Sequence, residues 1–432
     1  MLKRVPLNST TIEQSLWSRN YKALLFSITT TKFGSVGFIV AATMVVKELV
    51  DSGVIIALIL SMSALAGILF ASFAGIVVDN SARKQLFMRW SDASAFLVSC
   101  ALILIFAFTA SLYVKVISLM IVVFLFSCFE CFFNVSSRSL LPAIVGPANI
   151  TRANANIVTC VSVASISSQG LAALILAVVG PIVFFIIDAL TYLLSALSSF
   201  FICLKPTKKA ETLPIKYKMV FSSIKQSWLA SKDVPGISAL FILVSVVNFI
   251  SAPTAMYIVF LVVDRLGLSL HWYAWFMAFL TLGGVTGAFI SKQLARYSRY
   301  HILFFALVSL SLLKTALAFS SSLLLSVVIL FLEANLYTII SIMLISHLQT
   351  RAPHEILGKV LGMTELFGRV FMPAGLLIGG VLVDATQKNM PMVFFLNGVL
   401  LGVVCVIYGY LPVFKLFFRD ADTTENLAVE YD

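Results

Sequence analysis

Charged side chains are scarce in this sequence. Asp, Glu, Lys and Arg make up 11% of its 432 residues, hydrophobic residues make up 60%, and the mean hydropathy is +1.03. A soluble core cannot bury so large an apolar share, so the composition excludes a soluble globular protein. The apolar residues form long runs, each able to cross about 30 Å of hydrocarbon as a helix and far longer than a barrel strand. The sequence therefore predicts an all-α membrane protein.

The residue types that build catalytic and metal centres are few and scattered. The four histidines have no metal spacing and no nucleophile beside them, and the six cysteines lie in or at the edge of apolar runs. Cys128 and Cys131 form a Cys-x-x-Cys pair without a second pair or a nearby histidine, so we interpret the cysteines as reduced packing residues. The sequence has no ATP-binding Gly-x-x-x-x-Gly-Lys-Ser/Thr loop. We expect no enzyme, no metal, no catalytic residue and no cofactor, and the lack of this loop favours an ion gradient over ATP as the energy source.

Twelve apolar runs predict twelve membrane-spanning helices. Their expected bounds are 20–46, 53–78, 86–108, 113–137, 155–179, 181–204, 236–263, 270–295, 301–319, 323–349, 358–383 and 391–414. The longest polar interruption, 205–235, follows the sixth run. It predicts a central cytoplasmic linker between two six-helix bundles, the first at 20–204 and the second at 236–414. Apolar residues at helical spacing in this linker, such as Trp228, leave two interpretations open, an amphipathic helix on anionic lipid or a solvated linker.

The distribution of charge predicts the topology. The net charge is +11, and the basic residues gather at alternate turns, on the side that also holds the segments 1–19 and 415–432. The opposite side receives only Lys47, Lys115, Arg265 and Lys388. Basic loops stay in the cytoplasm, so we expect a cytoplasmic N-terminal segment and tail, in a bacterial inner membrane. Topology explains the positive charge without nucleic acid, and the expected partners of this monomer are membrane lipid and a small-molecule substrate.

A polar hinge joins the second and third runs. It contains Gly75, Asp79, Arg83 and Lys84. Glycine allows two helices to approach closely, and an aspartate can accept hydrogen bonds from a helix N-terminus. Arginine and lysine can pair with acids or with lipid phosphates. Their spacing resembles the loop between helices 2 and 3 of the major facilitator superfamily, with Asn80 where a basic residue is usual. The resemblance implies two pseudo-symmetric six-helix bundles that rock about a midplane site by alternating access, with this hinge as a gating loop.

Further motifs narrow the resemblance. In order, they are Leu-x-Pro at 140–142, Ala-Asn-Ala at 153–155, Phe-x-Ile-Asp-Ala at 185–189 and Leu-Gly-Lys-Val at 357–360. This set is similar to the branch that holds macrolide-efflux and enterobactin-type siderophore exporters. It implies a proton-coupled antiporter that exports a small amphipathic molecule, although the fifth run lacks the Gly-Pro of the antiporter signature. The alternatives are siderophore export, slightly favoured, and macrolide or multidrug efflux; a lipid flippase on the same fold is the alternative of another class.

Charged side chains within spans are costly, so each is a candidate functional residue. In this superfamily helices 1, 4, 7 and 10 line the cavity, which selects Lys32, Glu130, Asn248 and Glu333. Lys32 and Glu130 are expected to meet, either as a structural bridge or as a switch, because burial favours a protonated carboxyl and lysine an ionised one. Glu333 has no basic neighbour on its own helix, which makes it the first expected proton carrier. The positive charge of Lys32 favours an anionic siderophore as the substrate. A cationic macrolide would instead bind best if Glu130 and Glu333 were unpaired.

Other charges within the spans are expected to be structural. Glu365 and Arg369 are four residues apart, the spacing of an ion pair within a helix. Asp92 is expected to pair with a nearby arginine, and Lys314 to extend outward to the membrane surface. Pro253 and its polar neighbours predict a break in the seventh helix, which would act as a moving wall of the site.

Overall fold

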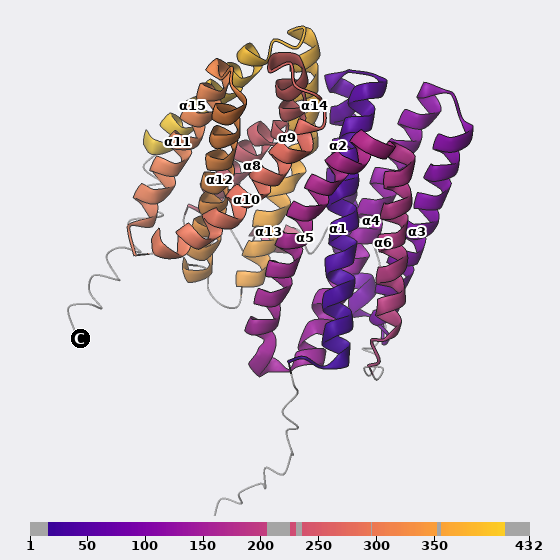
Figure 1. Cartoon of the computed structure of the whole chain (residues 1–432). Helices are drawn as coiled ribbons and strands as arrows, with labels where there is room; N and C mark the ends of the chain where they lie inside the picture. Colours follow the sequence, from indigo (N-terminus) through magenta and orange to yellow (C-terminus); the bar gives the residue numbers. More distant parts are fainter. Residues whose placement is uncertain (1–15, 205–224, 230–235, 295, 352–355, 411–432) are drawn as a thin grey trace, which may run out of the picture.

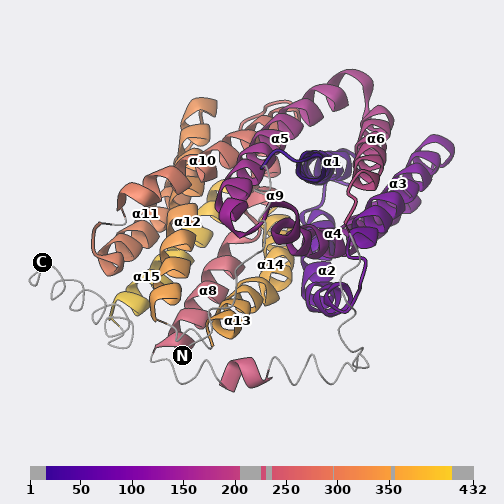
Figure 2. The same ribbon diagram turned by 90° about the horizontal axis from the view of Figure 1, so that it is seen from below.

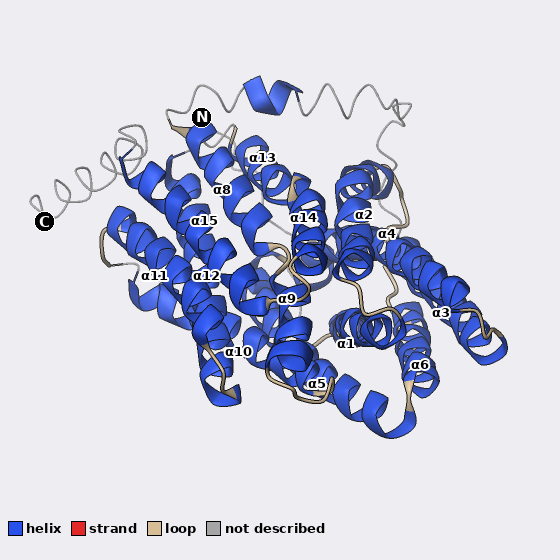
Figure 3. Ribbon diagram, turned by 90° about the horizontal axis from the view of Figure 1, so that it is seen from above, coloured by secondary structure: helices blue, strands red, loops and turns tan. Residues whose placement is uncertain are grey.

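The computed structural model describes residues 16–204, 225–229, 236–294, 296–351 and 356–410 (Figure 1). Within these ranges every regular element is a helix, and the view coloured by secondary structure contains no strand (Figure 3). Twelve of the helical spans are long and apolar enough to cross a membrane. The predicted class, an all-α protein with twelve membrane-spanning helices, is confirmed.

The first six spans are single helices. They are α1 (Arg19–Leu49), α2 (Gly53–Asp79), α3 (Gln85–Phe108), α4 (Leu112–Val145), α5 (Ile150–Val179), preceded by the short η1 (Pro147–Asn149), and α6 (Pro181–Phe200). The later single-helix spans are α10 (Trp272–Leu294), α11 (Arg299–Phe319), α12 (Leu323–Arg351) and α15 (Met390–Tyr410). The seventh span consists of α8 (Ile237–Ser251), α9 (Thr254–Phe260) and η2 (Leu261–Arg265), and the eleventh of α13 (Leu357–Val370) and α14 (Met372–Ala385).

The helices form two bundles of six spans that lie side by side. Helices α1 to α6 make the first bundle, indigo to magenta in Figure 1, and α8 to α15 make the second, pink to yellow. The most extensive contacts between them are those of α2 with α14 and of α5 with α10, which the view from below also shows (Figure 2). At the first contact a Cβ on Gly380 would lie 2.6 Å from the carbonyl oxygen of Gly53. Only small residues allow two membrane helices to come this close.

Two spans of the second bundle are interrupted near their middle. The seventh is divided between α8 and α9 at Pro253, which confirms the predicted break, since proline removes a helical hydrogen bond. The eleventh is divided at Phe371, just before Pro373. The break of the seventh span packs on α14, because a Cβ on Gly379 would lie 2.6 Å from the Pro253 ring. Breaks of this kind expose backbone and side-chain polar groups at mid-membrane depth.

The predicted end of the fourth helix was too early. The apolar run was expected to end at 137, whereas α4 continues through Pro142 to Val145, where Gly146 with φ 72° ends it. Helix α5 likewise begins at Ile150 rather than at 155. Hydropathy marks where the hydrocarbon ends, but a helix continues into the polar region until a residue such as glycine stops it.

The central linker is described only at 225–229, a short helical segment. Trp228 in this segment packs its ring at 6.1 Å from that of Phe241 on α8 and at 5.6 Å from that of Phe367 on α13. This segment therefore lies on the second bundle. The rest of the predicted linker, most of the segment 1–19 and the tail 415–432 lie outside the described residues.

Candidate functional site

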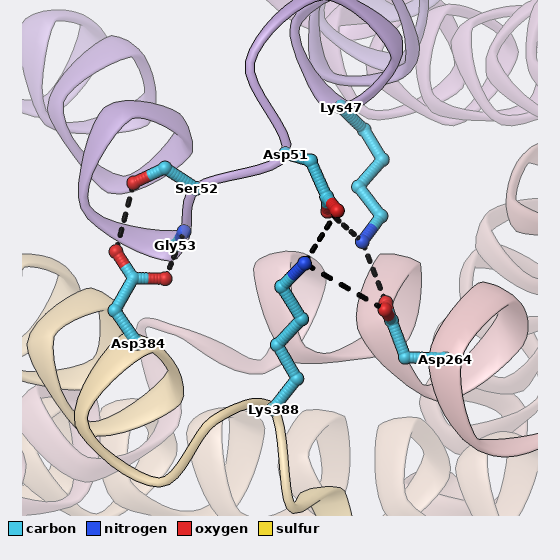
Figure 4. Close-up of polar contacts among 7 residues, drawn as sticks. All are labelled: Lys47, Asp51, Ser52, Gly53, Asp264, Asp384 and Lys388. Atoms are coloured by element: carbon cyan, nitrogen blue, oxygen red, sulfur yellow. Dashed lines mark hydrogen bonds and ion pairs between the residues drawn. The ribbon is translucent and has the colours of Figure 1, made fainter.

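Charged side chains join the two bundles at the end of the molecule where the α1–α2 and α14–α15 turns lie, which we call the closed end (Figure 4). Lys47 near the end of α1 pairs with Asp264 of η2 at 2.5 Å and also with Asp51. Lys388 in the α14–α15 turn pairs with Asp51 and lies 3.9 Å from Asp264. Each bundle thus contributes one lysine and one aspartate to this cluster, and the charges of the four side chains balance.

The side chains of this cluster are partly shielded from water, and an aromatic ring lies against one of its lysines. The side chain of Lys47 is only 4% exposed, and its ammonium lies 4.0 Å from the centre of the Phe260 ring. Burial raises the pKa of the Asp51 carboxyl, but hydrogen bonds from Lys388 and Lys47 outweigh it, so the net pKa lies below the usual 3.8. Asp51 and Lys388 have φ of 53° and 61°, a left-handed backbone that side chains rarely adopt.

A third acid, Asp384, joins the two bundles at the closed end through hydrogen bonds to the start of α2. Asp384 of α14 accepts hydrogen bonds from the Ser52 hydroxyl at 2.8 Å and from the backbone N–H groups of Gly53 and Val54 at 2.7 and 3.1 Å. A carboxylate at a helix N-terminus satisfies free N–H groups and complements the helix dipole. The second bundle therefore caps the first helix turn of α2, a contact that breaks when the bundles separate here.

A cavity of about 840 Å³ lies between the bundles, toward the opposite end. Its walls come from α1 and α2 on one side and from α8, α12, α13 and α14 on the other. Most lining residues are aliphatic, and Leu344 and Leu361 lie near the ends of α12 and α13 that are remote from the closed end. The cavity thus approaches the end of the molecule at which the α2–α3 turn lies, while ion pairs join the bundles at the closed end.

A smaller cavity of about 340 Å³, the side cavity, adjoins the first. Asn248 and Tyr337 line both cavities, and the Tyr337 hydroxyl donates to the Asn248 amide oxygen at 2.5 Å. The side cavity lies beside the break between α8 and α9, because Ser251 and Thr254 are in its wall. Glu333 of α12 also lines it. Asn248 and Glu333, two of the candidates selected from the sequence, are therefore neighbours in space.

Lys32 and Glu130 form an ion pair between α1 and α4, as the sequence predicts. Their side chains remain 29% and 28% exposed, so the pair is not sealed in the bundle. Lys32 precedes Ile39 by seven residues, two helical turns, which places both on one face of α1. Ile39 lines the large cavity. The pair therefore lies on the same face of α1 as Ile39, nearer to the end at which that helix begins, but neither of its residues is part of the wall of the large or the side cavity.

The expectation that Glu333 lacks a basic partner was wrong. Lys314 of α11 pairs with it and donates a second hydrogen bond to the Thr254 hydroxyl at 3.0 Å. The prediction that Lys314 extends outward was also wrong, because its side chain is 3% exposed and that of Glu333 is 7% exposed. The partner lies on the neighbouring span rather than on the helix of Glu333, so the sequence of α12 alone does not reveal it, and the two buried charges compensate each other.

Asp92 does not form the predicted ion pair with an arginine. It accepts hydrogen bonds from Thr31 at 3.2 Å and from Ser195 at 2.5 Å, and it takes part in no ion pair found within the described ranges. Arg89 donates instead to backbone carbonyl oxygens of α6 and the residues after it. Asp92 lies one helical turn further along α3 than Arg89 and is only 1% exposed, and hydroxyl groups of α1 and α6 are its partners there.

The gating loop predicted from the sequence lies at the end opposite the closed end. Asp79 pairs with Lys84 at 3.3 Å, and the Lys84 carbonyl oxygen accepts from Ser136 of α4 at 2.5 Å, so these contacts stay within the first bundle. Arg83 is in the turn between them. Gly75 does not provide the close helix approach that was expected, since nothing lies within 4 Å of its Cβ position. This end is the one toward which the large cavity extends.

Glu365 and Arg369 of α13 pair at 3.0 Å, the spacing that the sequence predicts. Both line the large cavity, and their side chains are 65% and 56% exposed. The structure thus adds them to the cavity wall. Sequence reasoning missed the closed-end cluster, although one signal was present: Lys47 and Lys388 are among the few basic residues on their side of the membrane.

Two six-helix bundles with a cavity between them, joined at one end, have the architecture of a secondary transporter. The chain belongs to the Major Facilitator Superfamily, whose family model matches residues 23–376. It is therefore a multi-pass membrane transporter and not an enzyme.

Individual relatives are distant. A stretch of 140 residues is 31% identical to the multidrug efflux pump Tap of Mycolicibacterium fortuitum, and this match spans 32% of the chain and only 34% of that relative. A mutant of the nucleoside transporter NupG superposes with a TM-score of 0.71 at 13% identity, over 92% of this chain and 100% of that one. A bacterial homologue of the human lysosomal transporter Spinster, inward-facing and unoccupied, gives 0.67 at 13% identity, over 95% and 98%. These structural likenesses show the fold alone.

Proposed function

We propose that this protein is a proton-coupled exporter of small amphipathic molecules, of the multidrug type. The cavity of about 840 Å³ carries this proposal, because its wall is mainly aliphatic with a few polar groups such as Asn248 and Thr364. Walls of this composition bind amphipathic ligands through apolar contact, with polar groups for orientation. The similarity of one stretch to a multidrug efflux pump supports the same substrate class.

Export is the proposed direction of transport, and the similarity of one stretch to a multidrug efflux pump supports it. With both termini in the cytoplasm of a bacterial cell, the closed end faces outward and the large cavity approaches the cytoplasm. An exporter loads its substrate in this arrangement. Release requires the ion pairs of Lys47 and Lys388 to break while the end near the gating loop closes. Asp79 and its neighbours in the gating loop would hold the two bundles together in that second arrangement, in which the cytoplasmic end is closed.

Glu130 is the proposed site of proton exchange. Glu333 loses this role because the reason for choosing it, the lack of a partner, does not hold. The Lys32–Glu130 pair is partly exposed and bridges α1 and α4, so water can bring protons to it. Protonation of Glu130 breaks the pair and frees the Lys32 ammonium, which changes how α1 and α4 are held together.

An anionic siderophore is the second candidate substrate, and the observation that favours it is the partly exposed Lys32. Its charge is compensated by Glu130, however, and that of Arg369 by Glu365. Charges that balance within the site favour a molecule without strong net charge over an anion. We therefore place the neutral or weakly charged amphipathic molecule first.

The test is accumulation of a macrolide and of a catecholate siderophore in cells that lack their own exporters, with and without a protonophore. Expression of the chain should lower macrolide accumulation, and the protonophore should abolish the effect. Glu130→Gln should reduce the protonophore-sensitive efflux at least tenfold. Glu48→Gln is the control for the loss of a carboxylate, because Glu48 is an exposed residue at the far end of α1, the helix that carries Lys32.

Unchanged efflux in Glu130→Gln would overturn the proton-exchange role. Lower accumulation of the siderophore alone would replace the first substrate class by the second. Accumulation of both compounds at the level of cells without the protein, despite normal membrane insertion, would refute export altogether.

A further inference from the structure

Two buried oxygen atoms in the wall of the side cavity have no hydrogen-bond partner within the described part of the chain. They are Oε2 of Glu333 and Oγ of Ser251. Glu333 as a whole is only 5% exposed, and its other carboxylate oxygen accepts from Lys314. A buried polar atom without a partner costs about 1–3 kcal/mol, so such atoms point to a ligand that satisfies them.

The other polar groups of this wall are already engaged. Asn248 donates its amide to the Val244 carbonyl oxygen and accepts from Tyr337, and Thr338 donates to the Ala334 carbonyl oxygen. Thr254 accepts from Lys314, and Thr281 exchanges hydrogen bonds with Gln169. Among the described residues, Oε2 of Glu333 and Oγ of Ser251 are therefore the buried oxygen atoms of this wall that have no partner. A volume of 340 Å³ is on the order of ten water molecules, enough for a ring that bears several polar groups.

The charge of the site selects the chemistry of its ligand. Glu333 and Lys314 together are neutral, and both side chains are buried. A cationic head would add an uncompensated charge here, and so would an anionic head, which also has no proton to donate to the carboxylate. A hydroxyl donates to Oε2 of Glu333 and exchanges a second hydrogen bond with Ser251 without adding charge.

We propose that the side cavity binds a neutral, hydroxyl-bearing head group of the transported molecule, such as a sugar ring, while the large cavity holds its apolar body. Glu333 accepts the hydrogen bond and Ser251 orients the ring. This inference rests on the proposed function, since it names the substrate class of the same site. The head-group site and the site of the apolar body adjoin at Asn248 and Tyr337, which line both cavities.

The test is binding of three naphthyl compounds to the purified full-length protein in lipid nanodiscs, followed by naphthyl fluorescence. The compounds share one apolar ring and carry a β-glucosyl, an aminoethyl or a carboxylate head. The glucoside should bind at least tenfold more tightly than the other two. Ser251→Ala should weaken glucoside binding about tenfold and leave the amine and the carboxylate within twofold, because it removes a single hydroxyl from the side cavity.

Ser118→Ala is the matched control, because Ser118 is a serine of α4 that lines neither cavity, and glucoside binding should stay within twofold. Equal binding of all three compounds, tightest binding of the amine or the carboxylate, or unchanged glucoside binding in Ser251→Ala would overturn the inference. If macrolide efflux persists in cells while any of these results is obtained, the export proposal stands and only the head-group assignment fails.

Discussion

Removal of the Lys47 charge tests whether the closed end holds the two bundles together. The ammonium of Lys47 lies between Asp51 and Asp264, over the ring of Phe260. Lys47→Met keeps an unbranched apolar side chain and removes the charge. The two carboxylates then share Lys388 alone, and the direct pair between α1 and η2 is lost.

The magnitude follows from burial. Breaking a fully buried ion pair by removing one partner costs about 3–5 kcal/mol. Lys47 is 4% exposed, but Asp264 and Asp51 are 22% and 49% exposed, so water screens part of the loss and we expect about 2 kcal/mol. Lys47 is hydrated when the bundles separate, so the loss falls on the closed arrangement alone. At 1.4 kcal/mol per factor of ten, opening becomes roughly 30-fold more favourable.

Hydrogen exchange at the α1–α2 turn measures this opening in the unlabelled protein. The N–H groups of Gly53 and Val54 donate to Asp384 across the bundle interface, so they exchange when the bundles separate. Their exchange should be roughly 30-fold faster in Lys47→Met. Lys115→Met is the control, because Lys115 lies at the same end within the first bundle. Unchanged protection of both amides in Lys47→Met would refute the reasoning.

Two further predictions concern stability and pH. Lys314→Met should destabilise the protein by about 3 kcal/mol in thermal unfolding, because it leaves Glu333 buried and uncompensated, and adding Glu333→Met should recover most of the loss; a double variant no more stable than the single one would contradict the pairing. Protection at Gly53, corrected for intrinsic exchange, should not change between pH 5 and 8. The pKa of Asp51 is lowered, so its ion pairs are fully present above its usual 3.8 and are lost only as the pH falls through the lowered value. Loss of protection within that pH range would show that another group controls the closed end.

The sequence predicted well whatever depends on one helix at a time. Span positions and the Glu365–Arg369 pair follow from local periodicity and spacing, and both agree with the structure. The end of α4 was missed because hydropathy reports the membrane thickness, whereas Gly146 ends the helix. The Lys32–Glu130 pair was within reach of the sequence because two opposite charges on inner helices of one bundle have few other partners.

Partners from other spans required the tertiary structure. Lys314 is the partner of Glu333, and Asp92 binds hydroxyl groups of other helices rather than an arginine. The relative rotation of neighbouring helices decides such contacts, and an apolar sequence leaves that rotation open, since lipid and core are equally apolar.

The sequence by itself determined that this is a membrane protein with twelve helical spans, which follows from the length of its apolar runs. The side on which lysine and arginine gather predicts its orientation, and the resemblance of its motifs to a known family predicted a transporter. Only the tertiary structure decided which end is closed, that Lys47, Asp51, Asp264 and Lys388 close it, and that Glu333 shares a side cavity with Ser251. Those residues are far apart in the chain, and packing of the bundles brings them together.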